Sequence, residues 1–385
     1  MKTLNAPGDL NISRVLRLIW QTKGISRIEI AQQLGIDKST VTKIVSALQE
    51  IGIIRAFAQG SAGPLGGRKP IQLEIVGEFG LSVGIEITTD GFVAAIADLN
   101  GTILHEVSQS LEVTSIFEAF DAAVGSLKPD IEGRNTPLLG IGVGIPAVVN
   151  AESGTILQSI PLMIEEETAF CAAMTEKYGV PVYLENDARC GCLGEMALRH
   201  GKGLENALFL LSEIRKITGS TGSRKNLSVG CGFILNGNPY YGREYSAGEF
   251  RSILWKPGNS GQFQSNDLSG ELVGSDRSVT GSVFSELAAH VALMANLLNL
   301  DSVFLGGLTP DLTEELALMI REEINLKWPY RKRQRCEVIP SSLGKTAVAY
   351  GAAGYCILRF FSLPNLYQPS GSGPSLKQTL EGIRS

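Results

Sequence analysis

A short stretch of the chain combines cations with small hydroxyl side chains at a spacing that suits contact with nucleic acid. The residues lie on one face of a predicted helix and are Lys38, Ser39, Thr40, Thr42, Lys43 and Ser46. Small hydroxyl residues let a helix settle into the major groove and bond phosphates or base edges, and lysines neutralise phosphates. A solvated helix face would show the same residues, so the surrounding elements must decide.

Three short amphipathic helices are predicted to hold this face. Apolar residues recur at helical spacing over residues 10–23, and Ser26 is placed to cap a second helix. A turn at Gly35 leads to a third helix, which Asp37 can cap and in which residues 41–48 repeat the apolar spacing. Helices joined by such a turn match a helix-turn-helix unit, which favours DNA contact over a solvated face.

A β-hairpin is predicted after the third helix. Residues 55–58 form one arm, and apolar residues alternate along the other arm at 71–75. The glycine-rich connection ends in adjacent cations, Arg68 and Lys69, which could reach along the minor groove or the DNA backbone. A plain linker would not need two adjacent cations, so we interpret the hairpin as a wing.

Charge separates this head from the rest of the chain. Residues 1–75 carry a net charge of +5 and the remainder −10, within 385 residues. A basic head on an acidic body favours contact of the head with a polyanion, with chance segregation of surface charge as the alternative. No apolar stretch approaches the ~20 residues of a membrane span, no signal pattern occurs, and six cysteines make no disulfide framework. We expect a cytoplasmic protein of two or three domains without membrane contact.

From about residue 79 the pattern changes to strands and helices. Strands are predicted at residues 84–87, 92–99, 103–110, 138–145, 181–184, 207–211, 232–235 and 302–305. Helices are predicted at residues 115–127, from 187 onward, and at 279–298, 310–326 and 344–361. Strands followed by crossover helices occur twice, which predicts a duplicated α/β body with a cleft between two lobes.

These segments resemble the ROK family of repressors and sugar kinases, in particular its repressor branch with a helix-turn-helix. The motifs that carry the resemblance are Gly66-Gly67-Arg68-Lys69-Pro70, Gly140-Ile141-Gly142-Val143-Gly144-Ile145-Pro146, Glu185-Asn186-Asp187, Ala247-Gly248-Glu249 and Phe304-Leu305-Gly306-Gly307. Each motif is weak alone, but their order and spacing span nearly the whole chain. The resemblance implies an N-terminal winged helix-turn-helix followed by an α/β two-lobed actin-like ATPase (ROK sugar-kinase-like) domain, in a homodimer or homotetramer.

The resemblance also implies a sugar site in the body. In ROK kinases the aspartate of the Glu-Asn-Asp motif takes the sugar hydroxyl proton, and Asp187 stands at that position. Asn186, Asp187 and Glu249 are the predicted contacts to a sugar or sugar derivative, and Glu271 stands near the last acidic contact of the family. Repressors can bind sugar with the same residue, and a helix N-cap is the alternative role of Asp187.

Both phosphate loops of the kinases are altered in this chain. The run Gly84-Ile85-Glu86-Ile87-Thr88-Thr89-Asp90 stands where kinases resemble Gly-Ile-Asp-Ile-Gly-Gly-Thr, so threonines replace the glycines that let backbone approach phosphate. An insertion at 213–227 replaces the second loop and contains Arg215, Lys216, Arg224 and Lys225. Its composition predicts a mobile loop, with an anion-binding lid as the weaker alternative. We therefore expect no enzymatic activity and no cofactor, with Asp187 a vestigial base.

The zinc site of the family is missing as well. Ser252 stands where the family has a histidine, and no cysteine occurs between Cys231 and Cys336, so a closed tetrahedral site cannot form there. Cys190 and Cys192 lie in the predicted helix after Asp187, where their spacing points the thiols to different faces. We expect packed core thiols and no metal.

The preferred interpretation is a DNA-binding transcriptional regulator, a repressor of carbohydrate metabolism, with a degenerate sugar-kinase-like effector domain. It would bind a double-stranded DNA operator, and a sugar effector would favour one arrangement of the lobes. An active ATP-dependent sugar kinase that retains a DNA-binding head is the alternative, and a module that senses a partner protein is the third hypothesis. The predicted domains are residues 1–78 (winged helix-turn-helix), 79–190 (first ROK lobe, completed by the helix 345–366), 191–344 (second ROK lobe) and 367–385 (disordered tail).

Overall fold

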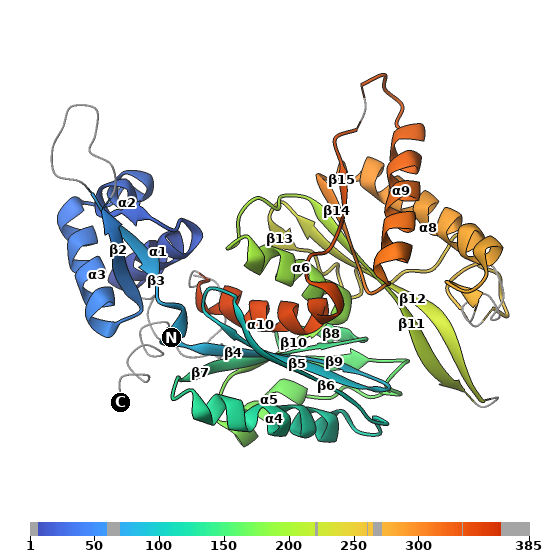
Figure 1. Cartoon of the computed structure of the whole chain (residues 1–385), viewed down its shortest axis with the longest axis horizontal. Helices are drawn as coiled ribbons and strands as arrows, with labels where there is room; N and C mark the ends of the chain where they lie inside the picture. Colours follow the sequence, from blue (N-terminus) through green and yellow to red (C-terminus); the bar gives the residue numbers. More distant parts are fainter. Residues whose placement is uncertain are drawn as a thin grey trace.

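A helical head is followed along the chain by a larger body with two five-stranded β-sheets (Figure 1). The computed structural model describes residues 7–59, 70–219, 222–259, 261–264, 272–332 and 334–362. The tail predicted at 367–385 lies outside the described residues, as does the glycine-rich tip of the predicted wing.

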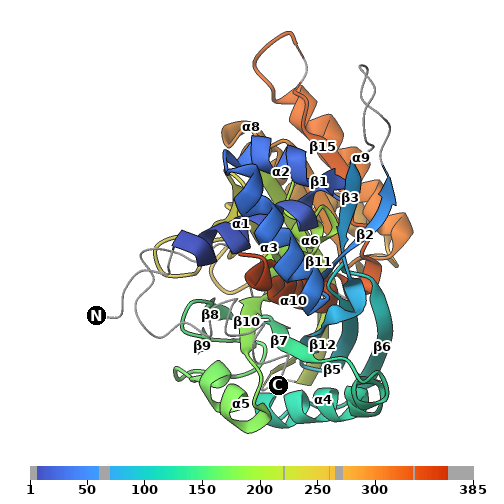
Figure 2. The same cartoon turned by 90° about the vertical axis from the view of Figure 1, so that its left-hand side faces the viewer.

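The head combines helices with a small sheet. Its elements are α1 (Pro7–Gln21), β1 (Ile25–Ser26), α2 (Arg27–Leu34), α3 (Lys38–Ile51), β2 (Ile54–Gln59) and β3 (Ile71–Ile75). The strands pair antiparallel in the order β1-β3-β2. Figure 2 shows the three helices grouped beside the β2–β3 hairpin. The predicted helices and hairpin arms are confirmed, and β1 is an additional short strand.

Capping residues set the boundaries of α2 and α3. Ser26 forms a reciprocal capping box with Glu29, in which Ser26 N donates to a Glu29 carboxylate oxygen at 2.8 Å. Gly35 ends α2 in the left-handed conformation, at φ 63°. The Asp37 carboxylate accepts from Ser39 N at 2.7 Å and so caps α3. Both predicted caps and the turn at Gly35 are confirmed.

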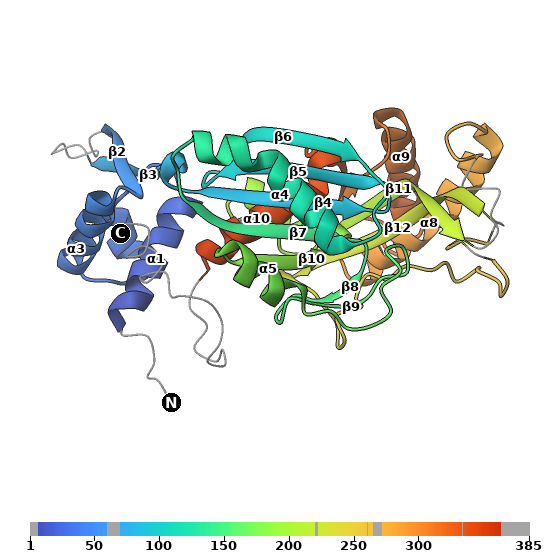
Figure 3. The ribbon, with the colours of Figure 1, turned by 90° about the horizontal axis from the view of Figure 1, so that it is seen from below.

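The first sheet of the body has the strand order β10-β7-β4-β5-β6. The elements of this part of the chain are η1 (Gly77–Phe79), β4 (Leu81–Thr88), β5 (Gly91–Asp98), β6 (Ile103–Ser110), α4 (Ile116–Gly133), β7 (Leu138–Ile145), β8 (Val148–Asn150), β9 (Thr155–Gln158), α5 (Phe170–Tyr178) and β10 (Val182–Asn186). An antiparallel meander of β4, β5 and β6 is extended by β7 and β10, which pair parallel. Figure 3 shows α4 lying across the sheet. The β8–β9 hairpin and α5 were not predicted.

The second sheet has the order β13-β12-β11-β14-β15. The remaining elements are α6 (Asp187–Leu198), β11 (Ala207–Gly219), β12 (Gly222–Leu235), β13 (Asn238–Pro239), α8 (Arg277–Leu297), β14 (Ser302–Gly306), α9 (Pro310–Leu326), β15 (Glu337–Pro340), η2 (Gly344–Thr346) and α10 (Ala347–Phe360). Three antiparallel strands followed by two parallel strands repeat the connectivity of the first sheet. The predicted duplication is therefore confirmed.

Strands β11 and β12 continue beyond the sheet as a two-stranded ribbon (Figure 1). Their pairing runs outward from Ser212↔Val229 to Gly219↔Gly222. The prediction that the insertion at 213–227 is a mobile loop was therefore wrong for the described residues. Its polar composition gave no strand signal, but antiparallel pairing satisfies the backbone groups of both strands, and Leu227 is buried in the adjoining core.

Two helices lie between the sheets. α10 packs on β4 and β7, α6 packs on β11 and β12, and the two helices contact each other. Glycines allow α10 to approach the first sheet, because a Cβ at Gly142 would lie 2.0 Å from Ala352 O and one at its β4 partner Gly84 would lie 1.9 Å from Ala349 O. The lobe boundary predicted at residue 190 falls inside α6, and the division into lobes stays a prediction.

In the described part of the chain, α8 is long and apolar enough by length and composition to cross a membrane. Half of its apolar window is buried inside the structure. Val283, Phe284 and Leu287 belong to the core that covers the second sheet. This burial is typical of a core helix.

Replacing Gly142 with alanine should destabilise the body, because the added methyl group meets the backbone of α10. Overpacking a core costs about 1–3 kcal/mol, and we expect a loss of that order in the free energy of unfolding by urea denaturation. Gly125→Ala is the matched control, since an added Cβ at this position in α4 meets nothing within 4 Å. The control should be stabilised by roughly 0.5–1 kcal/mol. A Gly142→Ala protein as stable as the wild type would contradict the close packing of α10.

Candidate functional site

The outer face of α3 presents the predicted DNA-contacting side chains. Residues Val41, Ile44, Val45 and Leu48 are buried in the head, which turns the opposite face outward. The predicted contacts on that face are exposed at Lys38, Ser39, Thr42, Lys43 and Ser46 and half-buried at Thr40. The Thr42 hydroxyl donates to Lys38 O at 2.8 Å. Arg68 and Lys69 lie outside the described residues, so their predicted contact with DNA stays a prediction.

Ion pairs connect the two strands of the wing to each other and to the segment that follows α1. The buried Glu74 carboxylate on β3 lies 2.8 Å from Arg55 Nε and 3.1 Å from Lys23 Nζ. Burial acts to raise the pKa of Glu74, but the two cations outweigh burial, and the pKa lies below its usual value. The base of the hairpin is thus held in a fixed position beside α1.

The Glu-Asn-Asp motif forms the junction between β10 and α6. Asn186 is the N-cap of α6, because its side-chain oxygen accepts from Arg189 N at 3.2 Å. The Asn186 amide nitrogen also donates to Ala147 O at 3.2 Å. Asp187 is the first residue of the helix, so its alternative role as the N-cap is wrong. Both polar groups of the Asn186 side chain are thus used within the fold, and the Asp187 carboxylate also contacts a segment outside the motif.

A buried ion pair holds the motif in place. The side chains of Glu185 and Arg189 are 1% and 2% exposed, and Arg189 Nε donates to Glu185 Oε1 at 2.7 Å. Arg189 Nη1 also donates to Tyr245 O and Ala247 O, both at 3.2 Å, and so ties the Ala-Gly-Glu segment to α6. Burial raises the pKa of Glu185 against the influence of Arg189. Sequence reasoning overlooked Arg189, although the i,i+4 spacing from Glu185 was a usable signal.

The β11–β12 ribbon places a cation on Asp187. Arg215 Nη2 donates to Asp187 Oδ2 at 2.7 Å, and Arg215 Nε donates to Glu213 Oε2 at 2.6 Å. The side chains of Arg215 and Asp187 are 13% and 6% exposed. Burial disfavours the charge of Arg215, but Glu213 and Asp187 outweigh burial and raise the pKa of Arg215. This pair was not predicted, because it depends on the paired conformation of the insertion.

A further carboxyl group, that of Glu86 on β4, lies near this ion pair. It is buried, and the charged groups that act on it include Glu213, Arg215 and Asp187. Burial, followed by repulsion from Glu213, raises the pKa of Glu86 well above its usual value.

The turn that follows β4 is closed by its own side chains. Thr88 Oγ1 donates to Asp90 Oδ1 at 2.9 Å and to Gly91 O at 3.3 Å. The run that stands at the first phosphate loop is thus a β-turn closed by its own side chains.

The Ala-Gly-Glu segment lies beside the start of α6. Glu249 forms an isolated bridge with Gly230 on β12, and a Cβ at Gly230 would lie 3.8 Å from Asp187 Oδ1. Gly248 has a φ of +97°, and a Cβ there would lie 1.8 Å from Cys231 O, so glycine is required. The Glu249 side chain is exposed. Glu271, the last predicted sugar contact, lies outside the described residues.

The two cysteines of α6 are packed in the core. Cys190 and Cys192 are buried, and burial raises the pKa of both thiols. Ser252 is buried too, and its hydroxyl oxygen accepts from Leu254 N at 3.0 Å within a turn. Over the residues that the structure describes, no group of three or more His, Cys, Asp or Glu side chains could hold a metal ion.

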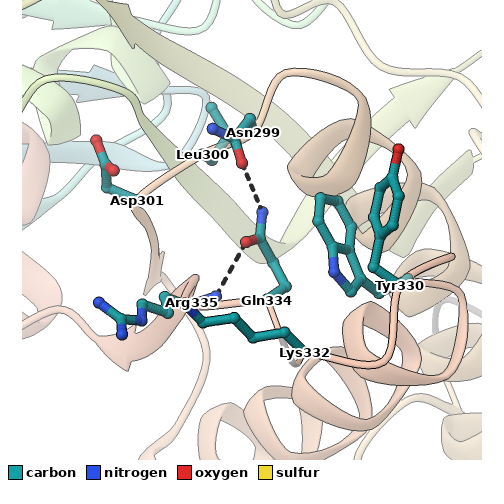
Figure 4. Close-up of a pocket in the computed structure, with 8 residues that line it drawn as sticks. Asn299, Leu300, Asp301, Tyr330, Lys332, Gln334 and Arg335 are labelled. Atoms are coloured by element: carbon teal, nitrogen blue, oxygen red, sulfur yellow. Dashed lines mark hydrogen bonds between the residues drawn. The ribbon is translucent and has the colours of Figure 1, made fainter.

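A surface pocket of about 500 Å³ lies apart from these groups, between the connection from α8 to β14 and the segment that joins α9 to β15 (Figure 4). Its wall includes Trp328, Tyr330, Lys332 and Arg335. Gln334 crosses the pocket, and its amide nitrogen donates to an Asn299 side-chain oxygen at 3.1 Å. None of the predicted site residues lines it.

The head rests on the body through Trp20 at the end of α1. The indole stacks between His200 and Phe361, with ring centroids 5.3 Å and 4.7 Å away. His200 Nδ1 lies 2.7 Å from Trp20 O, and Lys202 Nζ donates to Thr22 Oγ1 at 2.6 Å. Residues of the head and of α10 also share one hydrophobic cluster. His200 and Lys202 follow α6 closely, so the helix that starts at Asp187 ends at the head.

Two family models match the chain. A model described as the ROK family matches residues 82–259, and a model described as winged helix-turn-helix DNA-binding matches residues 9–55. The first match includes the Glu-Asn-Asp and Ala-Gly-Glu motifs. The second includes the whole of α3.

Several repressors are similar in sequence. A xylose repressor of Bacillus subtilis is 28% identical over 243 residues, which cover 62% of this chain and 59% of that protein. A xylose repressor of Bacillus spizizenii is 24% identical over 387 residues, covering 92% of this chain and 96% of that protein. The match with the first of these spans less than two thirds of its length.

Solved structures share the fold. A ROK family transcriptional regulator, described as a homologue of the Escherichia coli MLC protein, has a TM-score of 0.72 at 19% identity and covers 97% of this chain and 99% of its own. A ROK family glucokinase of Streptomyces griseus, in complex with glucose and AMPPNP, has a TM-score of 0.56 at 20% identity, covering 71% of this chain and 98% of its own. The regulator thus shares the architecture of head and body together, and the glucokinase that of the body.

Proposed function

Because the chain belongs to the ROK family and carries an N-terminal winged helix-turn-helix, we propose that it is a DNA-binding transcriptional repressor of carbohydrate metabolism whose body senses a sugar. The exposed lysines and hydroxyls of α3 support contact with a double-stranded DNA operator. The names of the similar repressors support a sugar as the effector.

The single observation that carries this proposal is the course of α6. Asp187, a proposed sugar contact, opens the helix, and His200 and Lys202, which hold the head, follow its last residue. At 12 residues the helix is about 18 Å long. A sugar that prefers one arrangement of the groups around Asp187 would shift the position of α6 and, through Trp20, the position of the head.

We propose that the repressor works in the cytoplasm as a homodimer or homotetramer. Leu293 and Leu297 on α8 and Leu318 and Leu326 on α9 are exposed, which supports a contact between subunits. Two identical heads would fit an operator with inverted half-sites.

We expect the intact chain to release no ADP above background when it is incubated with ATP and xylose or glucose. The closed turn at Thr88 and Asp90 lacks the glycine backbone that cradles phosphates, and Arg215 occupies an oxygen of Asp187. A coupled assay of ADP release measures this, with a ROK glucokinase as the positive control. Sugar-dependent ADP release would favour the alternative of an active sugar kinase with a DNA-binding head.

Replacing Lys43 with alanine should weaken binding to every DNA duplex and make the salt dependence shallower. Loss of one phosphate contact lowers the slope of log K against log salt concentration by about 0.9. Fluorescence anisotropy over a salt series measures the slope, with a duplex selected from a random-sequence pool. Lys128→Ala, which removes an equally charged exposed residue from α4, is the matched control and should leave the slope unchanged. An unchanged slope for Lys43→Ala would remove this lysine from the interface.

Replacing His200 with alanine should uncouple the head from the body. The variant loses the stack and the polar contact to Trp20 but keeps α3 and Asp187. We expect the variant to bind xylose or glucose, whichever binds the wild type, with unchanged affinity in calorimetry. Addition of that sugar should no longer change the Kd of the variant for DNA. His105→Ala, a partly exposed histidine on β6, is the control and should keep the response. A full response in the His200 variant would show that the signal takes another route.

A further inference from the structure

We infer that Arg215 is an internal ligand of the proposed effector site, which holds Asp187 when no sugar is bound and which an uncharged sugar must displace. This inference rests on the proposed sensing function and adds two points to it, namely the residue that competes with the effector and the charge class of the effector.

The contact with Asp187 occupies the atom that a sugar hydroxyl would use. Asp187 Oδ1 accepts from Ala188 N at 2.7 Å, and Asp187 Oδ2 accepts from Arg215 Nη2 at 2.7 Å. The Asp187 side chain is almost fully buried, so solvent has little access to the remaining lone pairs. A hydrogen bond between two ionised groups is stronger than one to a neutral hydroxyl. A sugar therefore gains full use of Asp187 only when Arg215 moves away.

The insertion can release Asp187 without leaving a lone cation. Glu213 and Arg215 lie two residues apart on β11, on the same face of the strand, and Arg215 Nε is already bonded to Glu213. When this stretch of the ribbon moves away from α6, it takes a neutral pair with it. Asp187 then regains the state of a single buried carboxylate, which suits hydroxyl donors.

The groups that remain after Arg215 leaves define the charge class of the ligand. Asp187 and Glu86 are carboxyl groups, and Glu249 stands at the neighbouring bridge to Gly230. The Glu86 carboxyl is buried, and its nearest charged neighbours include Glu213, Arg215 and Asp187, so with Glu213 and Arg215 moved away it stands beside Asp187 as a second carboxyl group. A phosphate or carboxylate on the sugar would be repelled by the Asp187 carboxylate. The site therefore suits an uncharged, unphosphorylated sugar.

If Arg215 bound the effector directly and did not compete with it, replacing Arg215 would change the affinity for the effector in the opposite direction. If the effector were a sugar phosphate or a sugar acid, Arg215 would be its natural partner, and removal of the guanidinium would weaken binding. If Arg215 competes with an uncharged sugar, removal of the guanidinium strengthens binding, because the fraction of molecules with a free Asp187 rises.

The test is a double variant, Glu213→Gln with Arg215→Gln, which removes one charge of each sign and leaves Asp187 unchanged. Calorimetric titration with D-xylose, D-glucose and D-glucose 6-phosphate is compared with the wild type. We expect the uncharged sugar that binds the wild type to bind the variant about tenfold more tightly, and glucose 6-phosphate to bind neither. The matched control is Lys128→Gln with Glu132→Gln, an exposed ion pair on α4, which should leave the Kd unchanged.

A second variant and a second measurement keep the inference testable should the double variant fold poorly. Arg215→Lys keeps the charge but cannot bond Glu213 and Asp187 through separate nitrogens, so its sugar affinity should lie between those of the other two proteins. In the wild type, the sugar should also speed amide hydrogen exchange in residues 212–215 and 226–229, which a purely structural role of Arg215 would not produce.

Weaker or unchanged binding of xylose or glucose by the Arg215 variants would overturn the inference while the sensing function stands. Tight binding of glucose 6-phosphate by the wild type that is lost in the variants would also overturn it, because Arg215 would then be an anion contact. If no protein bound any of the three compounds but all bound DNA, the inference would fall together with the sensing part of the proposed function.

Discussion

A Cβ at Gly351 of α10 would lie 1.8 Å from Cys190 O of α6, so these two helices meet at the distance of bare backbones. The same is true where α10 lies on Gly142 of β7 and where β12 passes Ala188 at Gly232. Contacts of this kind leave no side chain that could change its rotamer to absorb a shift. The two sheets are thus joined through α10 and α6, and movement at one end of α6 is carried to the other. The arrangement of effector groups and head depends on this packing.

Charge is concentrated at the beginning of α6, where two guanidinium groups with different origins meet the carboxylates. Arg189 is part of the helix and pairs with Glu185 inside the motif, whereas Arg215 comes from the insertion and pairs with Asp187. Buried ion pairs contribute little net stability because desolvation opposes their attraction. Removing one partner is nevertheless costly, because it leaves the other charge buried and unpaired. The first pair fixes the loop that carries Ala247, and the second links the ribbon to the helix. Their value lies in specifying positions.

The sequence predicted most of the fold and only part of the site. Local signals were strong for the head, because the caps at Ser26 and Asp37 and the apolar spacing of α3 act within a few residues. The strand pattern of the body predicted the longer strands but not the short β8, β9, β13 and β15, and its repetition indicated the duplication. The ribbon escaped prediction because its strands are held by backbone pairing and not by an apolar pattern. The ion pair of Arg215 with Asp187 and the stacking of Trp20 on His200 join residues that only the tertiary structure brings together. The cap of α6 is Asn186 and not Asp187, a difference of one residue in where β10 ends and the helix begins, which composition does not reveal.

The ribbon grows outward from two strands that already pair inside the core, from Ala207↔Ile234 to its tip at Gly219↔Gly222. Residues added in matched numbers to both strands preserve the alternation of inward and outward side chains, so nothing beneath them has to refold. Duplications or deletions of a few codons at a single turn could therefore lengthen or shorten this arm during evolution. Such changes would retune how firmly Asp187 is held while the hydrophobic interior and the head stay as they are.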